Sequence, residues 1–382
     1  PLAGLERGKV SLANPIRCRI GAANKLPPIN HPPLRQAVEH CQRAYFRPPA
    51  STKLFVAEGE VALFALTGED GTDSPGFKIS RGIEGWRGWV LPYNPWPLPK
   101  VRHSSIYHPF DVGVATPVLA TYHVAYLFKA PWYEPCANRD WAMIPKILAG
   151  TWPRKMPPIY ASPPAHWPEV SAFDSEFHGP VLTRYSMATE VRGNLEVWVV
   201  EAQDARVPKV GSKKPTVVFH STDADIQHLH RLLGGAEVTV EDTMMLHAVL
   251  WNDLDHDLDF LGSMYARVNR WKHLVHTNPR VYSGGDAVGT WDAFRSMSRE
   301  LERDPRSKHV YYTYQLPLIP IIGKARAHGA RLLPDRVQAA VEDLTKQQED
   351  AEALAQASVG WPLNLGSVPQ VAHWLYDIEK VK

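Results

Sequence analysis

Cysteine is scarce in this chain, and its scarcity excludes a fold held together by disulfides. Only Cys18, Cys41 and Cys136 occur in 382 residues, whereas small oxidised scaffolds carry many cysteines at short spacings. We therefore expect a reducing compartment, the cytoplasm. No stretch approaches the roughly 20 consecutive apolar residues of a membrane span, and no signal peptide is visible at the N-terminus. We expect no membrane association.

Net charge is also low, because 42 Lys and Arg stand against 40 Asp and Glu, a formal charge of +2. Domains that bind polyanions through charge alone are usually more basic than this. A nucleic-acid partner must therefore be argued from a local site. A hydrophobic content of 44% and a charged content of 21% are ordinary for a soluble globular protein.

Proline, in contrast, is abundant, and it marks a predicted domain boundary. Six of the 34 prolines fall between residues 151 and 168, and such a segment is stiff and extended. The chain length suggests two or three domains. We predict an α/β domain over 1–150, a linker over 151–168, a second α/β domain over 169–305 and a helical segment over 306–382.

Two acids stand two residues apart in the segment 171–179. Asp174 and Glu176 follow the apolar Ala172 and Phe173, and on a strand residues i and i+2 point to the same face. Adjacent carboxylates repel each other unless a cation lies between them, and hard divalent cations prefer oxygen ligands. The alternative interpretation is a solvated strand end that carries two acids by chance.

Further acids occur downstream in patterned positions. The β-branched run 215–220 predicts a buried strand, and Asp225 follows it near the N-terminus of a predicted helix. Tyr282 and Asp286 are four residues apart at the entry to another predicted helix, 287–301, so their side chains can share a face.

Taken together, these motifs resemble the 3′–5′ exonuclease domain of family A DNA polymerases, the tyrosine subtype of the DEDD nucleases. Asp174-Ser-Glu176 matches the family's first motif and Asp225 its second, although Ser221 stands where Asn is common. Tyr282 to Asp286 matches the third. The resemblance covers roughly residues 165–297 and implies a ribonuclease-H-like fold.

The resemblance also implies a mechanism with two Mg²⁺ or Mn²⁺ ions about 4 Å apart. Asp174 would bridge both ions, and Glu176 and Asp286 would hold the ion that carries the attacking water. Asp225 would support the second ion, and the Tyr282 hydroxyl would orient the water. The substrate would be the 3′ end of DNA. For stacking on single-stranded bases, Phe177, Tyr265 and Trp271 are candidates.

Residues 1–150 alternate predicted strands and helices, which indicates a largely parallel sheet. The predicted strands at 9–14 and 118–123 end on Asn14 and His123. These stretches resemble the later part of a uracil-DNA glycosylase domain. The resemblance implies a vestigial base pocket at Asn14 and His123, because the family's water-activating acid would lie upstream of Pro1.

The same family includes a branch with an iron–sulfur cluster, and Cys18 and Cys41 fall where its last two thiolates sit. Such a cluster takes four thiolates. With three cysteines in the chain, buried thiols without iron are the alternative that we favour.

The segment 306–382 resembles the passage from exonuclease to thumb in family A polymerases. A long polar helix is predicted over 336–357, and Asn364, Ser367 and Gln370 follow it. A long helix of this kind also occurs in bundles and coiled-coil arms. We interpret the chain as the N-terminal part of such a polymerase, with a polymerase core as partner in the same or another chain. The alternatives are a glycosylase-type repair protein and a non-catalytic DNA-binding subunit.

Overall fold

A computed structural model describes residues 5–16, 32–68, 82–94, 116–204 and 208–381. The chain divides into two compact units, Pro1–Ile321 and Ile322–Lys382. Within the described residues, none of the helices combines the length and the apolarity that a bilayer crossing requires.

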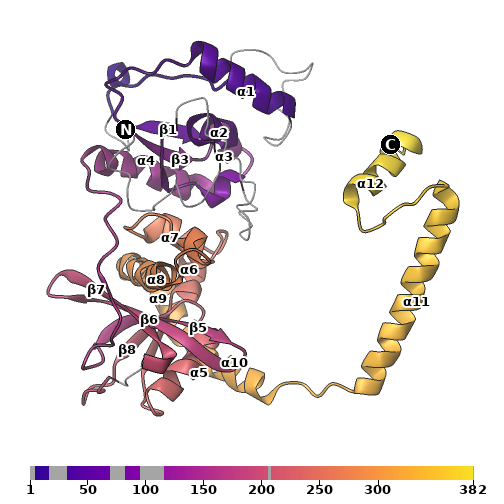
Figure 1. Ribbon diagram of the computed structural model, residues 1–382. Helices are drawn as coiled ribbons and strands as arrows, with labels where there is room; N and C mark the ends of the chain where they lie inside the picture. Colours follow the sequence, from indigo (N-terminus) through magenta and orange to yellow (C-terminus); the bar gives the residue numbers. More distant parts are fainter. Residues whose placement is uncertain (1–4, 17–31, 69–81, 95–115, 205–207, 382) are drawn as a thin grey trace. The chain divides into compact units, whose positions relative to one another are not determined.

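A three-stranded sheet forms the N-terminal part of the first unit (Figure 1). Its strand order is β1-β3-β2, with β1 and β3 parallel and β2 antiparallel to β3. The bounds are β1 Phe55–Glu58, β2 Val90–Pro92 and β3 Pro117–Thr121, with helices α1 Pro32–Tyr45, α2 Glu60–Thr67, α3 Val124–Leu127 and α4 Glu134–Leu148. Helix α2 ends because Gly68 adopts a left-handed φ of 81°, which glycine accepts without strain.

A six-stranded sheet carries the second part of this unit, in the order β4-β7-β6-β5-β8-β9. The strands β5, β6 and β7 form antiparallel pairs, whereas β8 and β9 continue from β5 in parallel. The bounds are β4 Ile159–Tyr160, β5 Val170–His178, β6 Val181–Val191, β7 Asn194–Glu201, β8 Thr216–Phe219 and β9 Thr239–Asp242. Strand β4, on one edge, comes from the proline-rich segment predicted as a linker.

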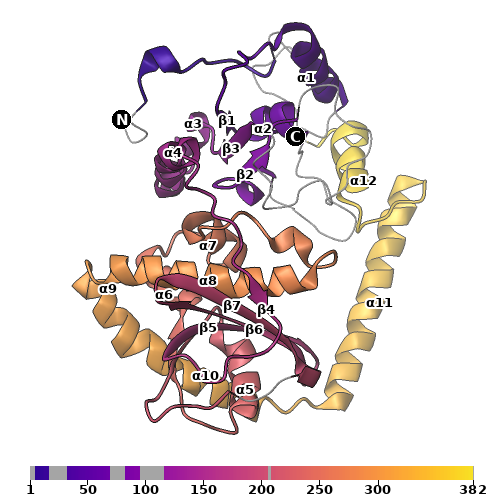
Figure 2. The same cartoon turned by 60° about the vertical axis from the view of Figure 1, so that its left-hand side comes forward.

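Helices cover both faces of this sheet (Figure 2). Helix α5 Thr222–Leu232 covers one face and α8 Pro279–Leu301 the other. Helices α6 Thr243–Leu250 and α7 Leu258–Tyr265 pack on α8, and α9 Pro305–Val310 and α10 Leu316–His328 come next in the sequence. Helix α8 packs Ala287 and Val288 against Ala172 of β5, whereas α5 packs Leu229 against Phe173 on the other face. The predicted α/β fold class with a C-terminal helical segment is confirmed.

The second unit consists of helices joined by two irregular segments, 329–333 and 360–367. Helix α11 spans Pro334–Val359 and ends at Gly360, whose φ is 70°. Helix α12, Val368–Ala372, and a π-helical turn, His373–Ile378, follow it. None of the described residues of α11 is buried. The long helix is slightly longer than the sequence pattern predicted, because Pro334 is tolerated in the first helical turn.

Two local predictions in the N-terminal region are wrong. Residues 10–14 do not form a strand, and Asn14 is exposed in irregular structure. Strand β3 ends at Thr121, two residues before the predicted end at His123. The polar and small residues of the first segment offer few apolar groups to bury, so its alternation does not fix a strand. Cys18 lies outside the described residues.

A buried ion pair ties α4 to the loop before β2. Arg87 and Asp140 lie 3.4 Å apart, and neither side chain is more than 1% exposed. Thr121 donates to the same carboxylate at 2.9 Å, and Arg87 also donates to Ser263 of α7. Burial raises the pKa of Asp140 to about 6, although Arg87 and Thr121 oppose the rise. The region of the three-stranded sheet and the region of the six-stranded sheet therefore share buried polar contacts.

We predict that Asp140→Ala lowers the free energy of unfolding by about 3–5 kcal/mol, because it leaves the Arg87 guanidinium buried without its charge partner. Urea denaturation measures the change. Lys213→Ala is the matched control, since its ion pair with Glu169 is exposed and should contribute less than about 1 kcal/mol. Equal losses in both variants would contradict the assignment.

Candidate active site: an acidic cluster between β5 and α8

Strand β5 presents two acids to helix α8. Asp174 and Glu176 alternate with Phe173 and Ser175, so they share the face on which Ala172 packs toward α8. In the antiparallel ladder, Asp174 stands opposite Ser186 of β6 and Glu176 opposite Arg184. The register shifts immediately after Glu176. Such a bulge re-aims the following side chains.

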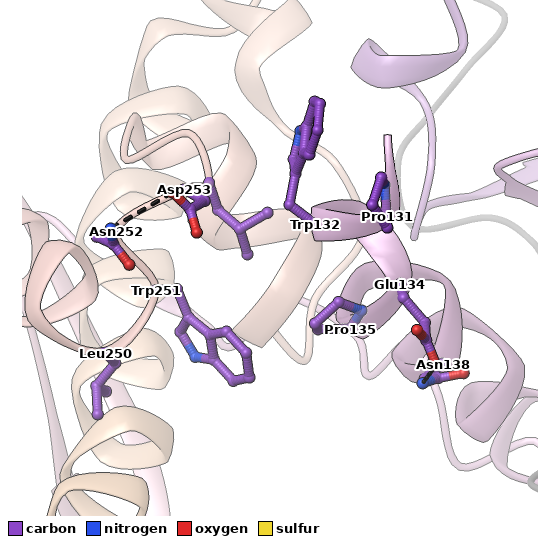
Figure 3. A pocket seen from close by; sticks show the side chains of 10 residues that line it. Pro131, Trp132, Glu134, Pro135, Asn138, Leu250, Trp251, Asn252 and Asp253 are labelled. Atoms are coloured by element: carbon purple, nitrogen blue, oxygen red, sulfur yellow. Dashed lines mark hydrogen bonds between the residues drawn. The ribbon is translucent and has the colours of Figure 1, made fainter. Parts of the chain in front are cut away.

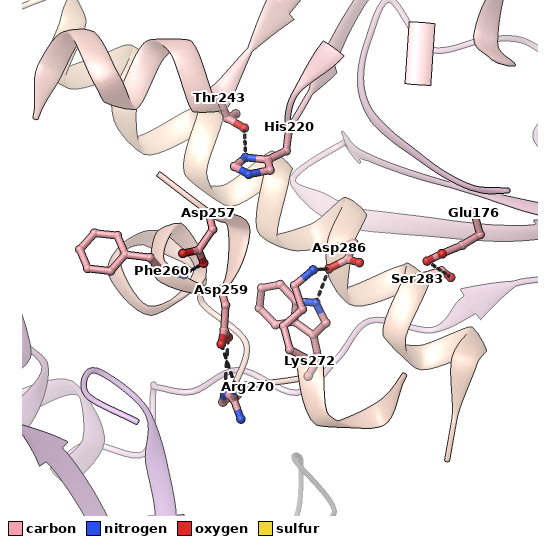
Figure 4. Close-up of polar contacts among 11 residues, drawn as sticks. Glu176, His220, Thr243, Asp257, Asp259, Phe260, Arg270, Lys272, Ser283 and Asp286 are labelled. Atoms are coloured by element: carbon pink, nitrogen blue, oxygen red, sulfur yellow. Dashed lines mark hydrogen bonds and ion pairs between the residues drawn. The ribbon is translucent and has the colours of Figure 1, made fainter. Parts of the chain in front are cut away.

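Helix α8 supplies the third acid, Asp286, from its buried face. The Oδ1 atom of Asp286 accepts a hydrogen bond from Trp271 Nε1 at 2.7 Å and lies 2.5 Å from Lys272 Nζ (Figure 4). One turn earlier on α8, Ser283 donates to Glu176 Oε1 at 3.3 Å. These contacts hold Asp286 of the helix and link Glu176 of the strand to the same helix.

One ligand oxygen each from Asp174, Glu176 and Asp286 can be chosen so that all three lie within 4.8 Å of one another. Burial raises the pKa of Asp174 well above its usual range, and the nearby Asp286 and Asp225 raise it further. Burial and Asp286 also raise the pKa of Glu176. The ionised cluster is therefore unfavourable by itself, and oxygen ligands at this spacing fit a hard divalent cation.

Asp225 lies beside this cluster in the first turn of α5. Its Oδ1 atom accepts hydrogen bonds from the Ser175 backbone N–H at 3.0 Å and from the Ser175 hydroxyl. Burial raises the pKa of Asp225 to about 6, although both hydrogen bonds oppose the rise. The carboxylate is thus directed toward β5, and it does not belong to the group of three.

Tyr282 lies on α8 one turn before Asp286. The Lys272 ammonium lies 5.0 Å from the centre of its ring. Burial and the neighbouring Asp286 raise the pKa of the Tyr282 hydroxyl, so it stays protonated at neutral pH. All five predicted residues of the exonuclease-like motifs therefore lie in one region of the molecule.

Sequence reasoning missed Lys272 and assigned Trp271 to base stacking, whereas both side chains hold Asp286. Both lie between α7 and α8, at the start of the short 3-10 helix Lys272–Leu274, where no periodicity links them to the motifs. The glycines of α8 carry a partial signal. A Cβ atom added at Gly285 would lie 2.3 Å from Trp271, and one at Gly289 would lie 2.5 Å from it. A helix with glycines spaced in this way indicates close approach of another group.

The three aromatic residues predicted to stack on bases differ in their exposure to solvent. Phe177 is 43% exposed and stacks on His228 of α5, with ring centroids 4.6 Å apart. Tyr265 and Trp271 are at most 1% exposed. Their prediction as base platforms is wrong, because both rings are used in the core.

The predicted residues of the N-terminal region do not join this cluster. His123 is exposed, and its Nδ1 accepts a hydrogen bond from the Ala125 backbone N–H at the start of α3. Cys41 is buried in α1. A separate hollow of about 360 Å³ lies between the start of α4 and the segment after α6, where Trp132 and Trp251 line it (Figure 3). It contains neither Asn14 nor His123.

No family model matches the chain, and no curated protein matches it. Among solved structures, the chain is similar to Brucella melitensis NrnC with bound Mg²⁺, at 17% identity over 45% of this chain and 92% of that one, with a TM-score of 0.36. Escherichia coli RNase D, an exoribonuclease, matches at 13% identity over 41% and 45%, with a TM-score of 0.30.

A third similar structure is the POL domain of Pol1 from M. smegmatis in complex with DNA primer-template and dNTP. It matches at 15% identity over 53% of this chain and 36% of that one, with a TM-score of 0.36. At such identities and scores, the function of this chain must be inferred from its own residues.

We predict that Asp225→Asn stabilises the metal-free protein at pH 7.5 by an amount on the order of 2 kcal/mol. The raised pKa means that Asp225 contributes stability below about pH 4, and that this contribution is lost as pH rises through about 6. The amide oxygen of Asn can still accept both hydrogen bonds from Ser175. Urea denaturation in EDTA at pH 4 and 7.5 should show a difference between variant and wild type only at the higher pH.

The exposed Asp335→Asn is the control for this comparison, and it should change stability little at either pH. A constant difference between Asp225→Asn and wild type across the pH range would contradict the burial of an ionisable carboxylate.

We predict that Gly289→Ala destabilises the protein by about 1–2 kcal/mol, because the added methyl group overlaps Trp271 in a packed core. Helix propensity alone would favour Ala by about 1 kcal/mol. Gly323→Ala in α10, where nothing lies within 4 Å of the added atom, isolates that propensity effect. If Gly289→Ala and Gly323→Ala have the same free energy of unfolding, the close packing of Trp271 on Gly289 does not constrain the fold.

Proposed function

We propose that this chain is a metal-dependent 3′–5′ exonuclease that acts on DNA. The observation that carries the proposal is the convergence of Asp174, Glu176 and Asp286 within 4.8 Å, with Asp225 and Tyr282 beside them. Buried acids without a cation are costly. Three acids from two separate elements, of which Glu176 and Asp286 are held by hydrogen bonds from Ser283 and Trp271, favour a built cation site over a chance arrangement.

In this proposal, Asp174, Glu176 and Asp286 hold the divalent cation. When bound, such a cation acidifies a water molecule and stabilises charge on the departing oxygen. The Tyr282 hydroxyl is protonated and would orient the attacking water. Attack on the terminal phosphodiester breaks the bond between phosphorus and the 3′ oxygen of the preceding nucleotide. The products are a nucleoside 5′-monophosphate and a strand shortened by one nucleotide.

The exposed Phe177 is the aromatic group that we propose contacts the terminal base. It lies next to Glu176 and is held by His228. Base–aromatic stacking tolerates every sequence, which suits an enzyme that removes nucleotides one after another. A chain with a net charge of +2 would rely on such local contacts more than on a general basic surface.

We further propose that this exonuclease proofreads for a family A DNA polymerase in the cytoplasm, with a polymerase core as partner in the same or another chain. The order of the motifs and the helical segment after them support this. In that segment, the Asn364 backbone N–H donates to Gln370 Oε1 at 2.9 Å. This bond links the segment before α12 to Gln370, which lies within that helix.

We predict that Asp174→Asn or Asp286→Asn lowers the rate of DNA degradation by about a hundredfold or more, because each removes a charge that would hold the cation. The assay is Mg²⁺- or Mn²⁺-dependent release of mononucleotides from a single strand labelled at its 3′ end, with EDTA as the metal-free arm. A 5′-labelled strand reports polarity, and an RNA strand of the same sequence reports sugar preference.

The exposed Asp253→Asn is the matched control and should keep wild-type activity. If Asp174→Asn degrades DNA at the wild-type rate while folded, or if EDTA has no effect, the proposed function is wrong. Shortening of the strand from its 5′ end would overturn the polarity alone.

A further inference from the structure

An ammonium group lies at the acidic cluster of this chain. Lys272 Nζ is 2.5 Å from Asp286 Oδ1, and its side chain is only 16% exposed. Lysine is ordinarily protonated at neutral pH, and this ammonium also lies 5.0 Å from the centre of the Tyr282 ring. Lys272 is therefore a permanent cation in contact with one of the proposed metal ligands.

The contacts of Asp286 show what this cation does to the ligand set. Its Oδ1 atom is shared by Lys272 Nζ and Trp271 Nε1, so both lone pairs of that oxygen are used. Only Oδ2 remains for a metal. In the same way, Asp225 Oδ1 is used by the backbone N–H and the hydroxyl of Ser175. Two of the four acids can thus offer one oxygen each.

The charge balance of the site also favours a single divalent cation. Asp174, Glu176, Asp225 and Asp286, when ionised, together with Lys272 leave three negative charges. One divalent cation reduces this to one, and a second would reverse the sign inside a partly buried site. Burial lowers the pKa of the nearby His220 to about 4, so it adds no positive charge at neutral pH. One divalent cation together with the ammonium therefore nearly balances the site.

We propose that Lys272 is a resident cation of this site, which holds Asp286 through one oxygen and replaces a second metal ion in the charge balance. The chain accordingly binds one divalent ion tightly. This inference rests on the proposed function, in which the acidic cluster holds a metal. It departs from the two-ion arrangement that the sequence resemblance implies. Lys272 is a positioning residue, because it acts through Asp286.

Metal stoichiometry tests the inference without any measurement of activity. Metal-free protein is titrated with MnCl₂ by calorimetry, and the same samples are examined by electron paramagnetic resonance. Wild type should bind one Mn²⁺ per chain and give the six-line spectrum of an isolated ion. Lys272→Met removes the charge and keeps most of the side chain. It should bind the first Mn²⁺ about tenfold or more tightly, and it should take up a second ion that is spin-coupled to the first.

Two variants control this comparison. Lys272→Arg keeps the charge and should still bind one ion, whereas Lys213→Met removes an exposed charge far from the cluster in sequence and should match wild type. Lys272→Gln is the substitute for Lys272→Met if circular dichroism shows that Lys272→Met is unfolded.

The outcomes separate this inference from the proposed function. Two coupled Mn²⁺ ions in wild type would overturn the resident-cation inference and leave a metal-dependent nuclease intact. An unchanged stoichiometry and affinity in folded Lys272→Met or Lys272→Gln would also overturn it. Absence of Mn²⁺ binding in wild type and every variant would overturn the proposed function as well.

Discussion

The hydrogen bond from Trp271 to Asp286 is the contact on which the rest of the site depends. Asp286 comes from a helix, whereas Asp174 and Glu176 come from a strand, and a carboxylate on a helix surface is free to rotate unless something holds it. Trp271 holds it at 2.7 Å, and the indole ring itself lies against Gly285 and Gly289 of the same helix. Because glycine has no side chain, the ring can approach closely enough to reach the acid.

This arrangement also connects the N-terminal region to the site. Trp89 packs edge-to-face on Trp271, with ring centroids 5.8 Å apart. Asn269, two residues before Trp271, accepts from the Val90 backbone N–H and donates to its carbonyl. A side chain that satisfies both backbone groups of a strand residue acts as a short extension of that strand. The N-terminal region therefore supports the loop that carries Trp271 and Lys272.

Much of the site follows from short-range rules that a sequence exposes. The i, i+2 spacing of Asp174 and Glu176 and the i, i+4 spacing of Tyr282 and Asp286 both place side chains correctly, because strand and helix periodicity fix them locally. The burial of Trp271 in the core could not be predicted from such spacing rules. An aromatic residue in an irregular segment is equally compatible with a surface platform and a core anchor, and only the packing of distant segments decides between them.

The strand predicted at 9–14 is absent for a similar reason, because strand formation also depends on distant segments. A few alternating residues form a strand only where a partner edge and an apolar surface are available, and neither can be recognised from one segment. The predicted domain boundaries at 150 and 168 remain predictions. The proline-rich segment between them contributes β4 to the sheet, and Arg154 in it forms an ion pair with Asp292 of α8 at 2.9 Å.

The central claim is that Asp174, Glu176 and Asp286 form one cation site. The most direct test is a crystal structure of the chain soaked in MnCl₂, with data collected at the manganese absorption edge. The account predicts an anomalous peak within bonding distance of an oxygen from each of these three residues. A structure in which manganese binds elsewhere, or in which Asp286 lies apart from Asp174, would contradict it.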